Sequence, residues 1–394
     1  MPATHELQDD IQRHEGYLQS DPGNLPLQLS LGDLYHQAGR LDEAVACYEQ
    51  CLAQVPGHPP ARSRLASVMI TQHRFADAEN VLRELLAQGG PDAALLHNLG
   101  LTLYYQQRWD EARECFTAAT RDGLQAPSNL AYLTRSLHHL GNMPDAIEAG
   151  RQWVAQAQDS KSKSYLALLY LDNNETENGR KLAVEVLAEN PDDTDANIVN
   201  GIALTEQQEM AQARQHFQTA LRQDPNNGRA WLGLGLAHLY EQEHPQAIEA
   251  LGNAVRIYPD NPGMIVALGW AQLTAKDPAA SEQTFRRAVE VDRNFGESHG
   301  GLASALAMQN KLAEAGEEIK VAKRLDRRGF GAEFARSAIL AIQGDQQAAT
   351  SALTRLLQHS APNSIVPLME HLRIYSAKKG PPVRPQLPTD ATKH

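Results

Sequence analysis

The residues of this chain that could do chemistry do not form a catalytic or phosphate-binding pattern. The Gly-Leu-Gly sequence at 233–235 lies inside an apolar helical pattern, whereas a phosphate-binding loop joins a strand to a helix. The acidic pairs at 42–43 and 110–111 fall where helices are expected to begin, and they suit the positive end of a helix dipole. No HExxH sequence and no GxSxG elbow is present. We therefore expect no catalytic residue and no enzymatic activity.

The three cysteines do not predict a metal site or a disulfide framework. Cys47 and Cys51 stand one turn apart on the same expected helix, and Cys115 stands alone. An odd number of cysteines without a CxxC pair favours a reducing compartment or indifference to oxidation. We expect all three to be small core residues, with no metal and no cofactor bound.

The sequence contains a repeat of about 34 residues, which sets the positions of the side chains in the fold. A small residue, usually after a Leu, recurs at intervals of 34 residues, with a single interval of 33 between the fourth and fifth positions. A fixed period of this length indicates a repeat architecture. The column contains Gly32, Ala66, Gly100, Thr134, Ala167, Gly201, Gly235, Gly269, Ala303 and Ser337.

A second column of small residues follows the first by twelve positions. Small residues on two successive helices allow the two backbones to approach closely. A large apolar residue follows four positions later in most units, although Gly150 and Ala183 depart from this pattern. The second column contains Ala44, Ala78, Ala112, Ala146, Gly179, Ala213, Ala247, Ser281, Ala315 and Ala349.

Turn residues separate the expected helices. A left-handed residue is expected at the end of several first helices, because Gly and Asn favour that conformation. These positions are Gly39, Gly141, Asn174, Asn310 and Gly344. Proline marks the ends of several second helices, at Pro22, Pro56, Pro191, Pro225 and Pro259.

These columns resemble the signature of the tetratricopeptide repeat (TPR) family. The units around Gly32, Gly201, Gly235 and Gly269 match it best, and the resemblance covers residues 25–363. It implies an all-α fold, a right-handed superhelical solenoid of about ten TPR helix pairs. It also implies that the first helix of each pair lines the concave side. Such a resemblance is specific for fold and weak for function.

The ends of the chain depart from the repeat. Residues 1–24 are expected to supply an N-terminal capping helix, and residues 364–375 a C-terminal capping helix, with a dimer contact as the alternative. Residues 376–394 are expected to be disordered, because they lack periodicity. The units near 150–180 are irregular, and either a hinge or local repacking around Trp153 would explain this.

Charge and hydropathy restrict the partners and the compartment. The net charge is −12, and it becomes −15 when the basic tail from Ser376 is set aside, which argues against nucleic acid as a partner. No stretch is apolar enough to span a membrane, and the N-terminus does not resemble a signal peptide. We expect a cytoplasmic protein, or a periplasmic one if a signal sequence has been removed.

The first helices carry a second apolar stripe beyond the one that stacking requires, in the third to eighth units. In the TPR family this stripe faces the concave groove, so the resemblance makes it the candidate partner-binding surface. Large exposed apolar patches mark binding sites, but adjacent first helices could instead bury these side chains against each other. The candidate residues are Leu101, Tyr104, Tyr105, Arg135, His138, Leu168, Leu171, Ile198, Ile202, Leu232, Leu236, Leu239, Tyr240, Val266, Trp270 and Leu273.

The stripe suggests a kind of partner without identifying it. It lacks the Lys/Asn carboxylate clamp of chaperone-binding TPR proteins, and Arg135 is the cation in its middle, with His138 and His139 nearby. We expect a scaffold or chaperone-like adaptor that binds an apolar or amphipathic protein segment. The resemblance implies roles such as secretion or envelope assembly. Two alternatives remain: a self-associating structural subunit, and a lipid or small-molecule binder.

Overall fold

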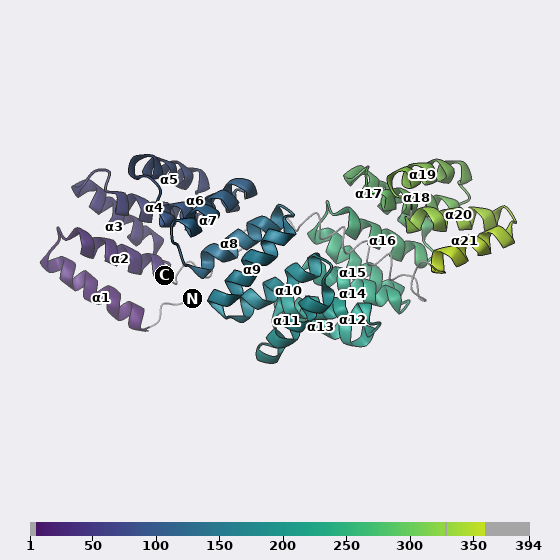
Figure 1. The fold of residues 1–394 in the computed structure, drawn as a ribbon, viewed down its shortest axis with the longest axis horizontal. Helices are drawn as coiled ribbons and strands as arrows, with labels where there is room; N and C mark the ends of the chain where they lie inside the picture. Colours follow the sequence, from purple (N-terminus) through teal and green to yellow (C-terminus); the bar gives the residue numbers. More distant parts are fainter. Residues whose placement is uncertain (1–4, 328, 359–394) are drawn as a thin grey trace. The chain divides into compact units, whose positions relative to one another are not determined.

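The computed structural model describes residues 5–327 and 329–358, and every regular element in that part of the chain is a helix (Figure 1). The all-α expectation is confirmed. The helices are α1 His5–Ser20, α2 Leu25–Gln37, α3 Leu41–Gln54, α4 Pro59–Thr71, α5 Phe75–Gly89, α6 Ala93–Tyr105, α7 Trp109–Arg121, α8 Pro127–His139, α9 Met143–Ala157, α10 Ser160–Asp172, α11 Thr176–Glu189, α12 Thr194–Glu206, α13 Met210–Gln223, α14 Gly228–Tyr240, α15 His244–Ile257, α16 Pro262–Thr274, α17 Pro278–Val291, α18 Gly296–Met308, α19 Leu312–Leu325, α20 Phe330–Ile342 and α21 Gln346–Gln358.

Helices α2 to α21 form ten consecutive pairs, one for each unit of the sequence repeat. Each first helix packs on the second helix of its own pair. Within α1–α9 and within α10–α21, each second helix also packs on the first helix of the next pair. Helix α1 precedes the first pair and packs on α2. Within each of these two stretches, successive pairs stack as the layers of a solenoid. The expected helix at 364–375 and the tail at 376–394 lie outside the described residues.

Each glycine of the first small column packs against an aromatic ring or a Leu side chain from the second helix of the same pair. A Cβ atom built on Gly201 would lie 2.8 Å from the ring of Phe217, and one on Gly269 would lie 2.8 Å from Phe285. The next pair also contributes a glycine, because a Cβ on Gly233 would lie 2.4 Å from the Phe217 ring. The Phe217 ring therefore lies between two pairs, and glycine makes room for it on both sides.

The turn inside each pair contains one left-handed residue, seven positions after the first small column. The five Gly and Asn residues named from the sequence have positive φ, from 60° to 87°. The other five pairs have the same conformation at His73, Gln107, Gln208, Gln242 and Lys276, with φ from 60° to 65°. The prolines behave as expected too, since the preceding helix ends two residues before each of them.

The described chain divides into two compact units, residues 5–157 and residues 158–358. The division falls within the region expected to be irregular. Trp153 is buried in α9 at 3% exposure, and local repacking around this side chain stays a prediction. The hinge stays a prediction, and each unit is described separately below.

The last pairs of the second unit approach each other unusually closely. Residues 296–307 of α18 are all buried, and α20 packs mainly on α18 rather than on α19. A Cβ on Gly300 would lie 2.7 Å from the backbone nitrogen of Ala332, and a Cβ on Gly331 would lie 2.5 Å from the carbonyl carbon of Gly300. Two glycines therefore allow direct backbone contact between these first helices.

Candidate functional site

The sixteen candidate residues of the second stripe divide into a buried group and a partly exposed group. Ten are buried, with 8% exposure at most: Tyr104, Leu168, Leu171, Ile198, Leu232, Leu236, Leu239, Val266, Trp270 and Leu273. Six are partly exposed: Leu101, Tyr105, Arg135, His138, Ile202 and Tyr240. At the ten buried positions the side chains pack against neighbouring helices, so the expectation of one long exposed apolar groove is wrong there. Partner binding by the stripe stays a prediction.

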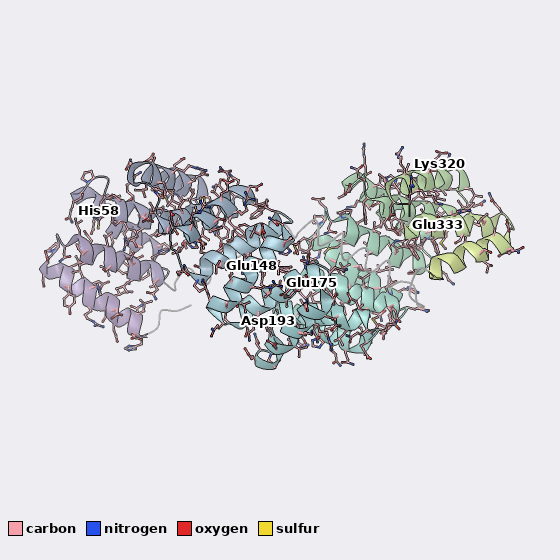
Figure 2. The ribbon with its side chains drawn as sticks, viewed as in Figure 1. His58, Glu148, Glu175, Asp193, Lys320 and Glu333 are labelled. Atoms are coloured by element: carbon pink, nitrogen blue, oxygen red, sulfur yellow. The ribbon has the colours of Figure 1, made fainter. Side chains whose placement is uncertain are left out.

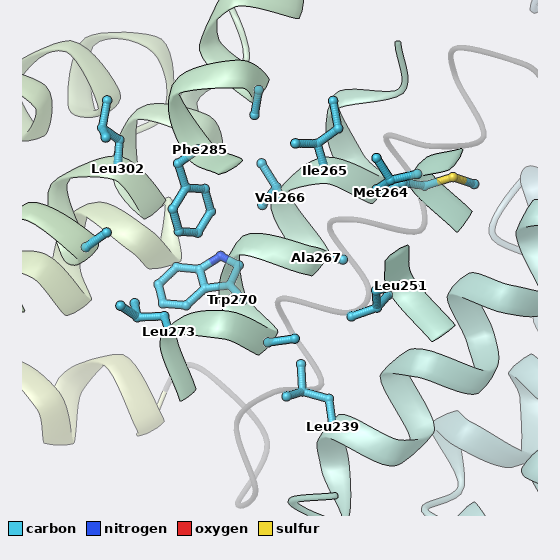
Figure 3. Close-up of a cluster of buried hydrophobic side chains, with 14 of the residues drawn as sticks. Leu239, Leu251, Met264, Ile265, Val266, Ala267, Trp270, Leu273, Phe285 and Leu302 are labelled. Carbon is cyan, nitrogen blue, oxygen red and sulfur yellow. The ribbon is translucent and has the colours of Figure 1, made fainter. Parts of the chain in front are cut away.

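Trp270 shows how the stripe is buried in the second unit (Figure 3). Its ring makes edge contacts with Phe285 of α17 and with Phe330 and Phe334 of α20, at centroid distances of 5.4–5.6 Å. Helix α20 belongs to the tenth pair and α16 to the eighth, so side chains two layers apart meet over α18. The small residues of α18 permit this contact, and it leaves Trp270 only 3% exposed.

A buried ion pair also links two layers of the second unit. Arg229, at the start of α14, donates from its two terminal nitrogens to the two carboxylate oxygens of Asp172, at the end of α10, at 2.9 and 2.8 Å. The side chain of Asp172 is 4% exposed and that of Arg229 is 17% exposed. Burial alone would lower the pKa of Arg229, but the Asp172 carboxylate raises it, and the net shift is upward. A bidentate pair of this kind fixes the spacing of the fifth and seventh pairs.

Glu297 is a second buried ionisable group, at the start of α18. The backbone N–H of Gly331 donates to its two carboxyl oxygens at 3.1 and 3.2 Å. Burial raises the pKa of Glu297 to about 8, and Asp326 adds to the rise, whereas the Gly331 N–H opposes it. The carboxyl group therefore joins α18 to the first turn of α20.

The first unit contains an aromatic cluster whose rings come from α5, α6, α7 and α8, and the partly exposed Tyr105 belongs to it. The hydroxyl groups of Tyr105 and Tyr132 are hydrogen-bonded at 2.9 Å, and the Tyr105 ring stacks on Phe75 at 5.4 Å. Tyr104 lies beneath, and its ring meets the ring of Trp109 edge-on at 5.0 Å. These contacts hold the aromatic side chains in fixed positions, although part of their surface is open to solvent.

Arg135 lies beside this cluster on α8. Its guanidinium carbon is 5.5 Å from the ring centroid of Tyr132 and 5.0 Å from that of Trp153, within the range of cation–π attraction. His139 stacks on Trp109 at 4.3 Å. Burial lowers the pKa of His139 to about 4, with further lowering by His138 and Arg135. His139 is therefore neutral at pH 7, and Arg135 carries a positive charge there.

We define the α6–α8 surface as Leu101, Tyr105, Arg135 and His138, the four stripe residues of the first unit that stay partly exposed. Sequence reasoning missed the residues that hold this surface in place, namely Tyr132, Trp109 and Phe75. They lie outside the stripe of the first helices. Their aromatic character was the available signal, but the repeat pattern does not reveal which rings on different helices meet.

The cysteines are free, and two of the three are buried. Burial raises the pKa of Cys47 and of Cys115 to about 11, so neither is an activated thiolate at neutral pH. Among the side chains that the structure describes, none form a cluster of three or more His, Cys, Asp or Glu that could hold a metal ion. None of the helices in this part combines the length and apolar character that crossing a bilayer requires.

Two curated proteins are similar to part of this chain. The human tetratricopeptide repeat protein 7B is 30% identical over 97 residues, which cover 25% of this chain and 12% of that protein. The type IV pilus assembly protein PilF of Pseudomonas aeruginosa is 33% identical over 98 residues, which cover 25% of this chain and 38% of PilF. The matched segment thus spans well under two thirds of either relative.

Two solved structures are similar to this chain. A human IFIT1 dimer with m7Gppp-AAAA has a TM-score of 0.51 at 16% identity, covering 91% of this chain and 95% of that chain. Yeast Tom70 has a TM-score of 0.40 at 17% identity, covering 95% and 93%. At 16% identity, the likeness to the IFIT1 structure concerns the fold alone. The family models for the tetratricopeptide repeat match residues 38–100, 97–161, 166–227, 198–262 and 266–330, which together exceed half of the sequence. The chain therefore belongs to the tetratricopeptide repeat family.

Proposed function

We propose that this protein is a non-enzymatic scaffold that binds a protein or peptide segment on the α6–α8 surface. The observation that carries the proposal is the partial exposure of Leu101, Tyr105, Arg135 and His138 beside an ordered aromatic cluster. Aromatic and Arg side chains held in place before binding lose little conformational entropy when a partner arrives, and they commonly dominate binding energy.

The second unit contributes less to this proposed function. Its stripe residues are mostly buried by their own neighbours, with Ile202 and Tyr240 as partly exposed exceptions. Buried side chains cannot bind a partner without rearrangement of the layers around them. The proposed role of the second unit is therefore structural support. A role in secretion or envelope assembly would agree with the PilF match, but this match spans only about a quarter of the chain.

Selection from a random peptide display library tests the proposal. The wild-type protein is expected to enrich a family of related peptides, and the variant Leu101→Ser/Tyr105→Ser to lose them. A control variant on the exposed face of α7, Glu114→Ser/Thr117→Ser, should retain them. The melting temperatures of all three proteins are compared, because Tyr105 also packs on Phe75.

Photocrosslinking keeps the test decisive if the double variant is unstable. A photoreactive amino acid placed at position 101 should crosslink the selected peptides, and one placed at position 117 should not. Enrichment of the same peptides by the wild type and by a folded Leu101→Ser/Tyr105→Ser variant would contradict the proposal. Crosslinks from position 117 alone would contradict it as well.

A further inference from the structure

The last described pair of the second unit, α20 and α21, is attached to the preceding layers mainly through α18 and to a lesser extent through α19. At the first turn of α20, the backbones of Gly300 and Gly331 are in direct contact, and Ser304 Oγ donates to the Gly331 carbonyl at 3.1 Å. The Gly331 N–H donates to both carboxyl oxygens of Glu297, at 3.1 and 3.2 Å. The hydrogen bonds to Glu297 therefore lie where the pair is attached.

This pair covers part of the second stripe. Phe330 and Phe334 of α20 contact the Trp270 ring edge-on, and their own two rings stack at a centroid distance of 6.0 Å. Trp270 is 3% exposed beneath them, and its indole nitrogen is buried. Movement of α20 away from α18 would therefore uncover Trp270.

The carboxyl group of Glu297 lies in surroundings that do not suit a charge. Glu297 is 2% exposed, and no basic side chain among the described residues pairs with it. The indole N–H of Trp270 lies near this carboxyl group but outside hydrogen-bond geometry, so the Gly331 N–H is its hydrogen-bond donor. A buried carboxylate without a cation is much less favourable than a neutral carboxyl group. The closed arrangement of α18 and α20 therefore favours the neutral form of Glu297.

The charged groups around α18 do not compensate a charge on Glu297. In the part of the chain that the structure describes, Asp326, after α19, is the charged group that acts on Glu297, and its negative charge opposes ionisation. Helix α16 contains no ionisable residue. Charged side chains on the other neighbouring elements form ion pairs with one another (Figure 2 labels Glu333): Glu282 with Arg286 and Lys311, Lys323 with Glu333, and His299 of α18 with Glu318.

We propose that α20 and α21 form a pH-dependent lid over Trp270, which the neutral carboxyl group of Glu297 holds closed. When Glu297 loses its proton, water can solvate the charge only if α20 moves away from α18. The contacts of Gly331 with Gly300 and Ser304 then open together, and protonation of Glu297 closes the lid again. The lid belongs to the second unit and does not depend on binding at the α6–α8 surface.

The sign and size of the pH effect follow from proton release. The pKa of Glu297 is about 8 in the closed lid, and it falls toward its ordinary value of about 4.3 when water reaches the group. Opening therefore releases a proton between these two pH values. The open fraction should rise about tenfold per pH unit within this range and level off above about pH 8.

Hydrogen exchange from about pH 5 to about pH 9 measures the open fraction. The exchange rate of each amide in residues 334–342 of α20 is divided by the rate of an unprotected amide at the same pH, which removes the intrinsic pH dependence. The wild type should show the rise, and Glu297→Gln should not, because it has no proton to release. The indole N–H of Trp270, assigned by comparison with Trp270→Phe, should follow the α20 amides, because the lid covers it.

Two further variants assign the effect to Glu297. Glu318→Gln makes the same chemical change on α19 and removes the carboxylate that raises the pKa of His299, and it should behave like the wild type. Asp326→Asn should show a smaller rise, because the pKa of Glu297 in the closed lid is lower without the Asp326 charge.

A rise that persists in Glu297→Gln would overturn the lid, as would an equal rise in the amides of α14, which would indicate unfolding of the whole unit. Slow, pH-independent exchange of the Trp270 indole while α20 opens would overturn the position of the lid over Trp270. If Glu297→Gln does not fold, a rise in Asp326→Asn as large as that of the wild type would overturn the proposal.

Discussion

The contact between Gly300 and Gly331 allows a sharp test of how the last pairs are packed. Gly300 is the fifth residue of α18, and a Cβ there would meet backbone atoms of α20 at 2.7–2.9 Å. Gly316 is the fifth residue of α19, and a Cβ there has nothing within 4 Å. Gly300→Ala and Gly316→Ala therefore make the same chemical change at matched helix positions, with and without a clash.

The two substitutions should change stability in opposite directions. Alanine in a helix interior is favoured over glycine by roughly 0.5–1 kcal/mol, so Gly316→Ala should stabilise α19 by about that amount. In Gly300→Ala the nearest contact must lengthen by roughly 0.7 Å, from 2.7 Å to the ordinary 3.4 Å. That movement strains the bond from Ser304 to the Gly331 carbonyl, now 3.1 Å, and overpacking of this kind typically costs about 1–3 kcal/mol.

Thermal melting and hydrogen exchange measure both effects. A solenoid can unfold in sections, so exchange of the α20 amides reports the local contact more directly than a single melting temperature. We expect faster α20 exchange and no gain in melting temperature for Gly300→Ala, and a small gain for Gly316→Ala. An equal gain from both substitutions would refute direct contact between the backbones of α18 and α20.

Three further predictions follow from buried or strained groups. Asp172→Ala should destabilise the second unit by about 3–5 kcal/mol, because it leaves the Arg229 charge unpaired, and Asp172→Leu/Arg229→Met should lose much less in urea unfolding. The pKa of Glu297 is raised in the folded protein, so the stability that this group contributes is complete below the unfolded pKa of about 4.3 and is lost as pH rises through about 8. The melting temperature of Glu297→Gln should therefore depend less on pH between these two values. A melting temperature that depends on pH as in the wild type would contradict the raised pKa of Glu297. Gln242→Gly should raise stability by roughly 0.5–1 kcal/mol, since Gln242 has a φ of 61°, and chemical denaturation would show any failure to do so.

The position of a residue in the 34-residue repeat predicts the left-handed turns of the backbone better than the residue type does. Gly and Asn identified five of the left-handed turn positions, and the same conformation occurs in the other five pairs at Gln, His or Lys. A side chain at Gln107 or Lys276 gives no local reason for a positive φ. The packing of two helices at fixed positions imposes the turn, so the 34-residue period is a better guide than the turn residue itself.

The burial of the second stripe could not be predicted in the same way. Helical periodicity shows which side chains share a face, but it does not give the distance between faces two pairs apart. Asp172 and Arg229 are 57 positions apart in the sequence, and their contact depends on how closely three layers stack. The contact of Trp270 with Phe330 and Phe334 depends in turn on the small residues of α18 between them.

Polarity within the stripe does indicate which part of it stays open. Nine of the ten buried stripe residues are Leu, Ile, Val or Trp, and the exception, Tyr104, places its hydroxyl group 3.5 Å from His139. Four of the six partly exposed residues carry a polar or charged group, Arg135 and His138 among them. Polar and charged groups cost more to bury than apolar ones, and these side chains stay partly accessible. In α18 the positions equivalent to Arg135 and His138 hold Ser304 and Ala307, both fully buried. Small residues at these positions of the stripe thus permit close packing of the layers, whereas large polar residues at the equivalent positions leave the face partly exposed.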